Sequence, residues 1–483
     1  MKIGCSVVKA SMGSVVLIFA FICLLFAGSE VSADEKATSL KLEHADRLIS
    51  SGENSEIVNL VGNVHLSHGN INVYSDRATW YRKSGLVQFL DSVLVIDEER
   101  RIEARTVTYY SRDKRVTARG DVKIEDTEEK ILLFCDDADY FRKNRQLIAA
   151  GNPILILNPH DDLARMEIRA RRMEYFGEES RGIAYDSVEI IKKRMNATSG
   201  LAEFYRDPER AVLTIDPVVH YGENELTGDT VSIFTREKQI DRLLVNGDAR
   251  AFYKTQPDTL VEDYTTTELT GRELEVFLEE DEIQKAVMRN NAISVYIPAI
   301  TDTLTRGTNT ASGDSITLYF DERLIRRVFI SGGARGHYVE PKFEEDAEEP
   351  KYDTTRYSGN EIDYRFDESE INLFGNAELR YHDMILNAGD IYYGIDTRIL
   401  TARGIIADST EDEIDTPVLL QGNEKMEGRT MTYNMDTKKG QVILARTEFE
   451  KGFYRGEKIR QVSDDVLFVS QGNYTSCDNP EHV

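Results

Sequence analysis

Catalysis and metal binding require nucleophiles, acid–base pairs or metal ligands at defined spacings, and the candidate residues of this chain lack these spacings. His65 and His68 are three residues apart in an alternating stretch, so a strand would place them on opposite faces, where they could not hold one metal ion. The glycine-rich stretch 332–336 has no serine at its centre and no helical pattern after it, which excludes a nucleophile elbow. We therefore expect no enzymatic activity, no cofactor and no metal site.

The acidic residues give the chain its charge but no identifiable site. Lys and Arg number 59 against 85 Asp and Glu, a formal net charge of −26, which repels phosphate backbones and excludes nucleic acid as a partner. Adjacent carboxylates such as Asp136-Asp137 cannot be singled out as an acid–base pair among so many others. The acidic runs 344–346 and 411–413 lack the spacing and the turn glycine of a calcium loop, so we interpret them as solvated surface loops.

The first 33 residues differ from the rest of the chain. Two lysines precede an apolar run at 15–27, and Val31-Ser32-Ala33 follows as a small-x-small cleavage pattern. This order predicts a secretory signal peptide over residues 1–33 and a mature protein that starts at Asp34, outside the cytoplasm. The apolar run is shorter than the roughly twenty residues that span a bilayer, which disfavours the alternative of an uncleaved membrane anchor.

Two cysteines, Cys135 and Cys477, remain once the signal peptide is removed. Cys135 lies in a strand-like stretch where other copies of the repeat described below have Ser, Ala or Gly, so we interpret it as a small buried residue. Cys477 lies in a polar tail near the end of the chain. The residues alone leave open whether it pairs with Cys135, pairs with a partner elsewhere or stays free.

One pattern recurs along the mature chain: a small residue is followed three and five positions later by apolar side chains. Successive copies start mostly near 29 residues apart, with four longer spacings, and only the last copy breaks the pattern, at Gln461. The copies are Ser75/Ala78/Trp80, Ala104/Val107/Tyr109, Cys135/Ala138/Tyr140, Ala170/Met173/Tyr175, Ser199/Ala202/Phe204, Gly228/Val231/Ile233, Gly271/Leu274/Val276, Gly313/Ile316/Leu318, Gly359/Ile362/Tyr364, Ala388/Ile391/Tyr393, Gly428/Met431/Tyr433 and Gly456/Ile459/Gln461.

The spacing within the copies indicates β-structure. Side chains two positions apart share one face of a strand but would point about 200° apart on a helix. Several units also contain a glycine followed by an alternating run, such as 62–66 and 120–124, and charged turns such as 112–115 separate the segments. We predict an all-β fold, an elongated β-jellyroll or taco of about twelve strand-pair repeats that forms one array over residues 34–470.

The longer spacings are explained by insertions. Their extra residues are mostly polar or acidic, and we expect them to form surface loops at one edge of the repeating scaffold. The insertions are 255–268, 301–310, 341–357 and 409–417.

The residue five positions after each small residue forms an apolar, largely aromatic stripe on the predicted inner face. The stripe either fills a closed solenoid core or lines a continuous apolar groove between the two halves of a folded sheet, long enough for acyl chains. Its candidate lining residues are Trp80, Tyr109, Tyr140, Tyr175, Phe204, Ile233, Val276, Leu318, Tyr364, Tyr393 and Tyr433.

These repeats resemble the OstA-like domain of lipopolysaccharide (LPS) transport proteins. The resemblance rests on Gly-Asn-Val-x-Leu units followed by a small residue, Asp or Arg, an apolar residue and Tyr, and it covers roughly residues 40–470. This domain occurs in the periplasmic bridge proteins LptA and LptC and at the N-terminus of the outer-membrane protein LptD. The resemblance implies a periplasmic β-taco that carries LPS acyl chains in its interior, with the head-group sugars in solvent.

The last residues extend the resemblance. Tyr474-Thr475-Ser476-Cys477-Asp478 is similar to the segment that leads from the N-terminal domain of LptD into its β-barrel, which implies a disulfide role for Cys477. We therefore expect residues 471–483 to be a stub that resembles this linker, without the barrel. A truncated LptD relative and a stand-alone periplasmic protein both remain open.

The sequence as a whole favours a periplasmic lipid-conduit protein that carries LPS, or a related lipid, toward the outer membrane. Because the chain is acidic, an anionic lipid would be held by its tails. Terminal strands would offer unpaired edges to other OstA-like proteins, and an outer-membrane barrel is a further possible partner. A structural or adhesive surface β-solenoid, or a polysaccharide-acting β-solenoid enzyme, are the alternatives.

Overall fold

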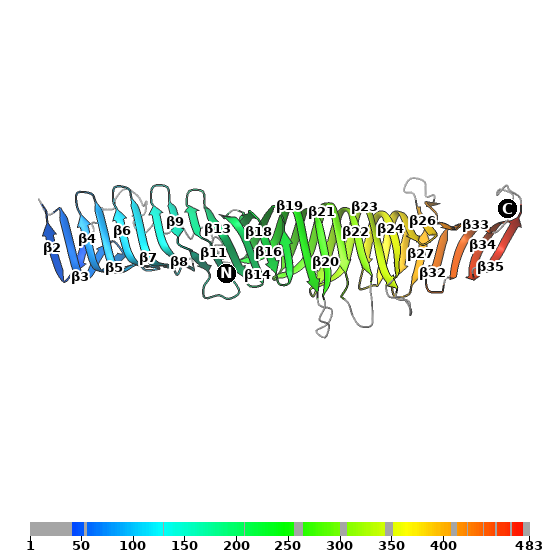
Figure 1. Cartoon of the computed structure of the whole chain (residues 1–483), viewed down its shortest axis with the longest axis horizontal. Helices are drawn as coiled ribbons and strands as arrows, with labels where there is room; N and C mark the ends of the chain where they lie inside the picture. Colours follow the sequence, from blue (N-terminus) through cyan, green and yellow to red (C-terminus); the bar gives the residue numbers. More distant parts are fainter. Residues whose placement is uncertain are drawn as a thin grey trace, which may run out of the picture. The chain divides into compact units, whose positions relative to one another are not determined.

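The computed structural model describes residues 41–476 apart from 53–55, 129, 207, 256–263, 300–306, 343–350, 407–412, 423, 438, 450–451 and 464–465. The described residues form β-strands and no α-helix, which confirms the predicted all-β fold (Figure 1). Accordingly, no helix able to cross a membrane is found among them. The predicted signal peptide, residues 1–33, and Cys477 lie outside the described residues.

The chain divides into two compact units between Val245 and Asn246, within strand Gln239–Thr255 (β19). The strands of unit 1 are Lys41–His44 (β1), Arg47–Ser51 (β2), Ile57–His68 (β3), Ile71–Tyr81 (β4), Leu86–Ile96 (β5), Arg100–Tyr110 (β6), Arg115–Asp126 (β7), Ile131–Phe141 (β8), Gln146–Ala150 (β9), Ile154–Leu157 (β10), Met166–Arg169 (β11), Arg172–Phe176 (β12), Arg181–Lys192 (β13), Met195–Arg206 (β14), Glu209–Thr214 (β15), Val218–Tyr221 (β16), Asn224–Thr227 (β17) and Thr230–Arg236 (β18).

Unit 2 continues with strands that are longer at first and shorter toward the end. They are Thr265–Glu279 (β20), Glu282–Ile297 (β21), Thr308–Asp321 (β22), Leu324–Lys342 (β23), Lys351–Arg365 (β24), Glu370–Tyr381 (β25), Met384–Gly394 (β26), Ile399–Arg403 (β27), Ile405–Ile406 (β28), Glu413–Ile414 (β29), Val418–Gln421 (β30), Glu424–Glu427 (β31), Thr430–Asn434 (β32), Lys439–Phe449 (β33), Gly452–Ser463 (β34) and Val466–Thr475 (β35).

Neighbouring strands pair antiparallel, and every second strand bends sharply near its middle. In β3 the bend is at Gly62-Asn63, whose φ angles are 80° and 46°, and β7 bends in the same way at Gly120-Asp121. The pairing register shifts there: Val61 lies opposite Arg77 and Val64 opposite Ser75, so β3 has one extra residue. Glycine, Asn and Asp tolerate this left-handed conformation best, which explains the recurring Gly-Asn and Gly-Asp pairs. Sequence analysis placed these pairs before a strand, whereas they lie within one.

The bends divide unit 1 into two limbs, which we call limb A and limb B. Limb A contains the short strands β9, β12, β15 and β18, and limb B contains β10, β11, β16 and β17. Long strands run through both limbs: β13 has Arg181–Tyr185 in limb A, bends at Asp186-Ser187 and continues in limb B. The limbs therefore meet along a line of bends.

The bends explain the spacing of the sequence repeat. In β4, β8 and β14 the buried residues alternate in steps of two, except for one step of three opposite the bend of the neighbouring strand. The small residue is the last buried position of limb B, and the residues three and five positions later belong to limb A. This small residue lies opposite the residue that directly follows the bend of the neighbouring strand. Cys135, for example, lies opposite Val122. Space is tight there: a Cβ on Gly313 would lie 2.7 Å from Ile330 Cγ2.

Parts of the insertions of unit 2 form strands, contrary to the expectation from their polar composition. Thr265–Glu268, Thr308–Thr310 and Lys351–Tyr357 belong to β20, β22 and β24, which extend the sheet. Alternating Thr, Tyr and charged residues suit a solvated strand as well as a loop. Composition alone therefore could not distinguish the two.

Alanine at the bend between β9 and β10 is expected to destabilise unit 1. Gly151 has φ +78°, and a Cβ there would lie 2.4 Å from Asp136 Cβ, an atom that cannot rotate away. We expect Gly151→Ala to lower the free energy of unfolding by about 2–3 kcal/mol. Urea denaturation followed by the fluorescence of Trp80, the one tryptophan of the chain, measures the loss.

The matched control for this prediction is Gly69→Ala. Gly69 also has a positive φ, +63°, but nothing lies within 4 Å of the added Cβ. The free energy of unfolding of this variant should fall only by the cost of the strained backbone conformation, about 1 kcal/mol. Equal losses for the two variants would contradict the steric explanation.

Candidate functional site

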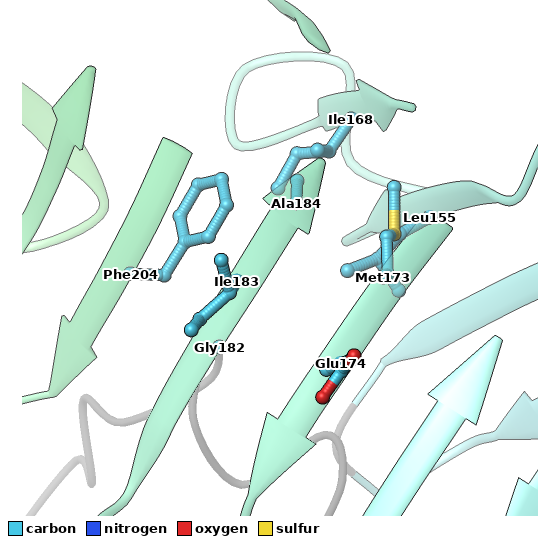
Figure 2. A pocket seen from close by; sticks show the side chains of 8 residues that line it. All are labelled: Leu155, Ile168, Met173, Glu174, Gly182, Ile183, Ala184 and Phe204. Atoms are coloured by element: carbon cyan, nitrogen blue, oxygen red, sulfur yellow. The ribbon is translucent and has the colours of Figure 1, made fainter. Parts of the chain in front are cut away.

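The candidate site of unit 1 is the apolar interior between limb A and limb B. A small recess of about 10 Å³, room for about one water molecule, lies there and is partly open to solvent. Figure 2 shows its lining: Leu155 and Ile168 from limb B, and Met173, Glu174, Gly182, Ile183, Ala184 and Phe204 from limb A. Gly182 has no side chain, whereas its neighbours in the stripe carry large ones, so the space beside Gly182 stays unfilled. The recess is apolar but much smaller than an acyl chain, so such a chain would enter only if the two limbs moved apart.

The structure places most of the predicted lining residues in the interior of their own unit. Tyr140 and Tyr175 are each only 1% exposed, whereas Trp80 is 37% exposed at the end of β4, with the Arg82 guanidinium 4.8 Å from its ring centre. The buried members are Tyr140, Tyr175, Phe204, Ile233, Val276, Leu318 and Tyr364, and the half-buried ones are Tyr109, Tyr393 and Tyr433.

The two inner limb A positions of the repeat differ in size. Along β8, Ala138 lies next to the bend and Tyr140 nearer the strand end. On the paired strand β15 the order is reversed, with Leu213 opposite Ala202 and Ala211 opposite Phe204. Large and small side chains therefore alternate between paired strands, which lets them fill the interior together.

The free ends of the two limbs of unit 1 are joined by hydrogen bonds. Lys238, in the turn after β18, donates to Asn158 Oδ1 at 3.4 Å, and Asn158 follows β10 of limb B. Lys192, only 3% exposed, donates to the carbonyl of Ala164 in the same loop at 3.4 Å. Burial raises the pKa of nearby Glu209, opposed by a hydrogen bond from Thr235 and by the two lysines. Sequence analysis missed this bridge, because its residues lie up to 80 positions apart.

A second internal bridge lies in unit 2, on either side of the bend in β24. Tyr357 donates to Asn309 Oδ1 and also contacts the hydroxyl of Tyr364, and Asn309 donates to Tyr364 at 3.2 Å. The two rings pack edge to face with centroids 6.3 Å apart. Burial raises the pKa of Tyr364 to about 12 and that of Tyr357 well above its usual value of 10. Only Tyr364 was predicted as a lining residue.

The surroundings of Cys135 and of the histidine His65 indicate structural roles. Cys135 is a buried free thiol whose pKa is raised to about 12, first by burial and then by Asp137 and Asp136. His65 is hydrogen-bonded to Asn72 at 2.9 Å and stacks on Tyr74. Across the described part of the chain, no three His, Cys, Asp or Glu side chains are grouped to hold a metal ion.

Comparisons with known proteins add a family. Residues 37–200 match the family described as OstA-like protein. Among solved structures, the chain is similar to LptH, the LptA homologous periplasmic component of the conserved lipopolysaccharide transport device from Pseudomonas aeruginosa, at 15% sequence identity and a TM-score of 0.24. This similarity covers 32% of the present chain and 93% of the other. No curated protein matches the chain.

Proposed function

We propose, from the match of residues 37–200 to the family described as OstA-like protein, that the protein is a periplasmic lipid carrier of the LPS transport type. Acyl chains would lie between limb A and limb B of unit 1 and move from there toward the outer membrane. The observation that carries the proposal is the apolar lining that both limbs contribute to the interior; the small recess marks where an acyl chain would enter as the limbs move apart. Each methylene transferred from water to this lining gains about 0.8 kcal/mol.

The distribution of charge supports binding through the tails. The buried inner faces are apolar, while ion pairs such as Arg119–Asp139 and Arg181–Glu203 involve part-exposed side chains. A chain with a net charge of −26 would repel a phosphorylated lipid that it contacted only through acidic residues. Burial of the acyl chains offsets this repulsion, since it is independent of charge.

The first strands supply an edge for a partner. Among the described residues, β1 and β2 pair only with β3, and all their side chains are exposed, including Leu48 at 56%. An open antiparallel edge can accept a strand from another OstA-like protein by main-chain hydrogen bonds. The proposal therefore includes edge-to-edge assembly, with β1 and β2 as the contact of this chain.

Filling the recess tests the proposal. Gly182 has no positive φ, and a Cβ there would meet Phe204 Cβ at 3.7 Å, an ordinary contact. We expect Gly182→Leu to keep the fold and to weaken binding of cis-parinaric acid, a fluorescent acyl chain, by about tenfold or more, since several methylene contacts are lost. Gly182→Ala should bind nearly as the parent protein does and be slightly more stable.

Native mass spectrometry of the purified mature chain complements the titration, because it detects bound species that contain lipid A. A Gly182→Leu variant that is folded, by its urea midpoint, and binds parinaric acid as tightly as the parent would contradict acyl binding at the recess. A parent protein that binds neither parinaric acid nor LPS would contradict the proposed function altogether.

One observation favours a structural repeat protein instead. Tyr140 and Tyr175 are almost fully buried, and the free ends of the two limbs are bridged by Lys238 and Asn158. A closed core of this kind predicts that Gly182→Leu changes stability alone. The same pair of measurements therefore separates the two functions.

A further inference from the structure

A row in which aromatic side chains alternate with Arg, Leu or Gln crosses the outer face of limb A in unit 1. Each aromatic residue directly follows an inner-face residue of the repeat, so it points to the opposite side of the sheet. Each member lies opposite the next on the neighbouring strand. We call these residues the outer row: Tyr81, Leu86, Tyr110, Arg115, Phe141, Gln146, Phe176, Arg181, Tyr205, Arg210 and Phe234.

The arginines of the outer row are stacked on its rings. The Arg115 guanidinium lies 4.2 Å from the ring centre of Tyr110 and 5.9 Å from that of Phe141. Arg181 lies over Phe176 at 5.4 Å, and Arg210 lies over Tyr205. Such stacking fixes the guanidinium planes while the rings remain half-exposed. The outer row is thus a pre-organised surface.

Two cations of the outer row are not neutralised. Arg181 forms ion pairs with Glu179 and Glu203 at 2.9 and 3.4 Å. Arg115 and Arg210, by contrast, have no carboxylate partner in the part of the chain that the structure describes. In a chain with a net charge of −26, unneutralised arginines between aromatic rings are complementary to a ligand that combines negative groups with apolar ring faces.

The spacing of the outer row fits a chain of sugars. Strands lie about 4.8 Å apart, so an aromatic ring recurs every 10 Å or so, and the row is about 48 Å long. Two rings of an extended oligosaccharide span a similar distance. The C–H faces of sugars pack on aromatic rings, and their phosphate or carboxylate groups accept hydrogen bonds from arginine.

The same arrangement recurs independently in unit 2. Phe277, Lys285, Tyr319 and Arg327 lie opposite one another in that order on β20 to β23. Lys285 lies over both aromatic rings beside it, and Arg327 lies 5.4 Å from the ring centre of Tyr319. Recurrence in both units indicates that the alternation of ring and cation belongs to the repeat.

The position of the outer row identifies the source of the sugars. The row is the last paired position before the turns of limb A, and the inner stripe with Tyr109 and Tyr140 ends at the same turns. A lipid whose chains lie between the limbs must emerge past a strand end, where its head group can reach the outer row. We propose that the outer row binds the anionic sugar head group of the glycolipid whose acyl chains occupy the interior; this inference rests on the proposed function.

The test removes the two free charges without touching the interior. The variant is Arg115→Gln/Arg210→Gln, and its matched control is Arg77→Gln/Arg105→Gln, which loses two arginines that are paired with Asp91 and Asp121. The probes are the lipid-free phosphorylated oligosaccharide obtained by deacylation of LPS, measured by calorimetry, and cis-parinaric acid. We expect the outer-row variant to bind the oligosaccharide about five- to tenfold more weakly than the control does, with parinaric acid binding unchanged.

A second variant, Tyr205→Ala/Phe234→Ala, tests the rings, with Tyr74→Ala on the outer face of limb B as its control. It should weaken oligosaccharide binding about tenfold, and circular dichroism checks that it is folded. Equal oligosaccharide binding by outer-row and control variants would overturn the inference, as would no binding by the parent at millimolar probe. If parinaric acid still binds in that case, the proposed function survives. Tighter binding of uncharged chitohexaose than of the phosphorylated oligosaccharide would overturn the glycolipid as the source.

Discussion

Leu213→Ala is expected to destabilise unit 1 by about 2–5 kcal/mol, a large part of the stability of such a unit. Leu213 is fully buried in limb A near the bend at Ile215-Asp216, opposite Ala202 on β14 and Val231 on β18. Its small neighbour Ala202 cannot move to fill the cavity that the substitution leaves. The loss should therefore lie in the upper part of this range.

The effect of Leu213→Ala is measured by urea denaturation, and its control is a substitution on the same strand. Urea denaturation followed by Trp80 fluorescence reports on unit 1, which contains this tryptophan. Val212→Ala removes two methyl groups from the opposite, half-buried face of β15 and should cost below about 1 kcal/mol. Losses of similar size at the two positions would mean that the interior between the limbs is not the core of unit 1.

The second large effect is expected at alkaline pH, in unit 2. The pKa of Tyr364 is about 12 in the folded protein because the hydroxyl is buried, against a usual value of 10. A pKa that is higher in the folded state gives stability that is complete below pH 10 and is lost as the pH rises toward 12. Two pH units correspond to roughly 3 kcal/mol for this group alone. Tyr357, whose pKa is raised in the same direction, adds to the loss.

Tyr364→Phe separates this titration from other alkaline effects. At neutral pH it should be about 1 kcal/mol less stable, since its hydrogen bond with Asn309 is lost. Between pH 10 and 12 its free energy of unfolding should fall by less than that of the parent, measured by urea titration with circular dichroism. Tyr352→Phe, at a tyrosine that is 65% exposed, serves as the control. A parallel fall in all three proteins would rule out Tyr364 as the cause.

The repeat made much of the fold predictable. Regular positions such as Ala138 and Tyr140 reveal strands because alternation is a local property of the backbone. The recess was not predictable, since it depends on Gly182 of limb A and Ile168 of limb B lining the same space. The outer row had a signal that went unused, an aromatic residue six positions after the small one, as in Tyr110 and Phe141.

By itself, the sequence determined the all-β class, the repeat of about 29 residues and the stripe of apolar side chains, because each follows from spacing along one strand. Only the tertiary structure decided that the step of three lies opposite a bend, that the limbs are bridged by Lys238 and Asn158, and that Tyr357 reaches Tyr364. These contacts join residues whose separation in the chain bears no relation to their separation in space. They depend on where each strand bends, which is set jointly by neighbouring strands.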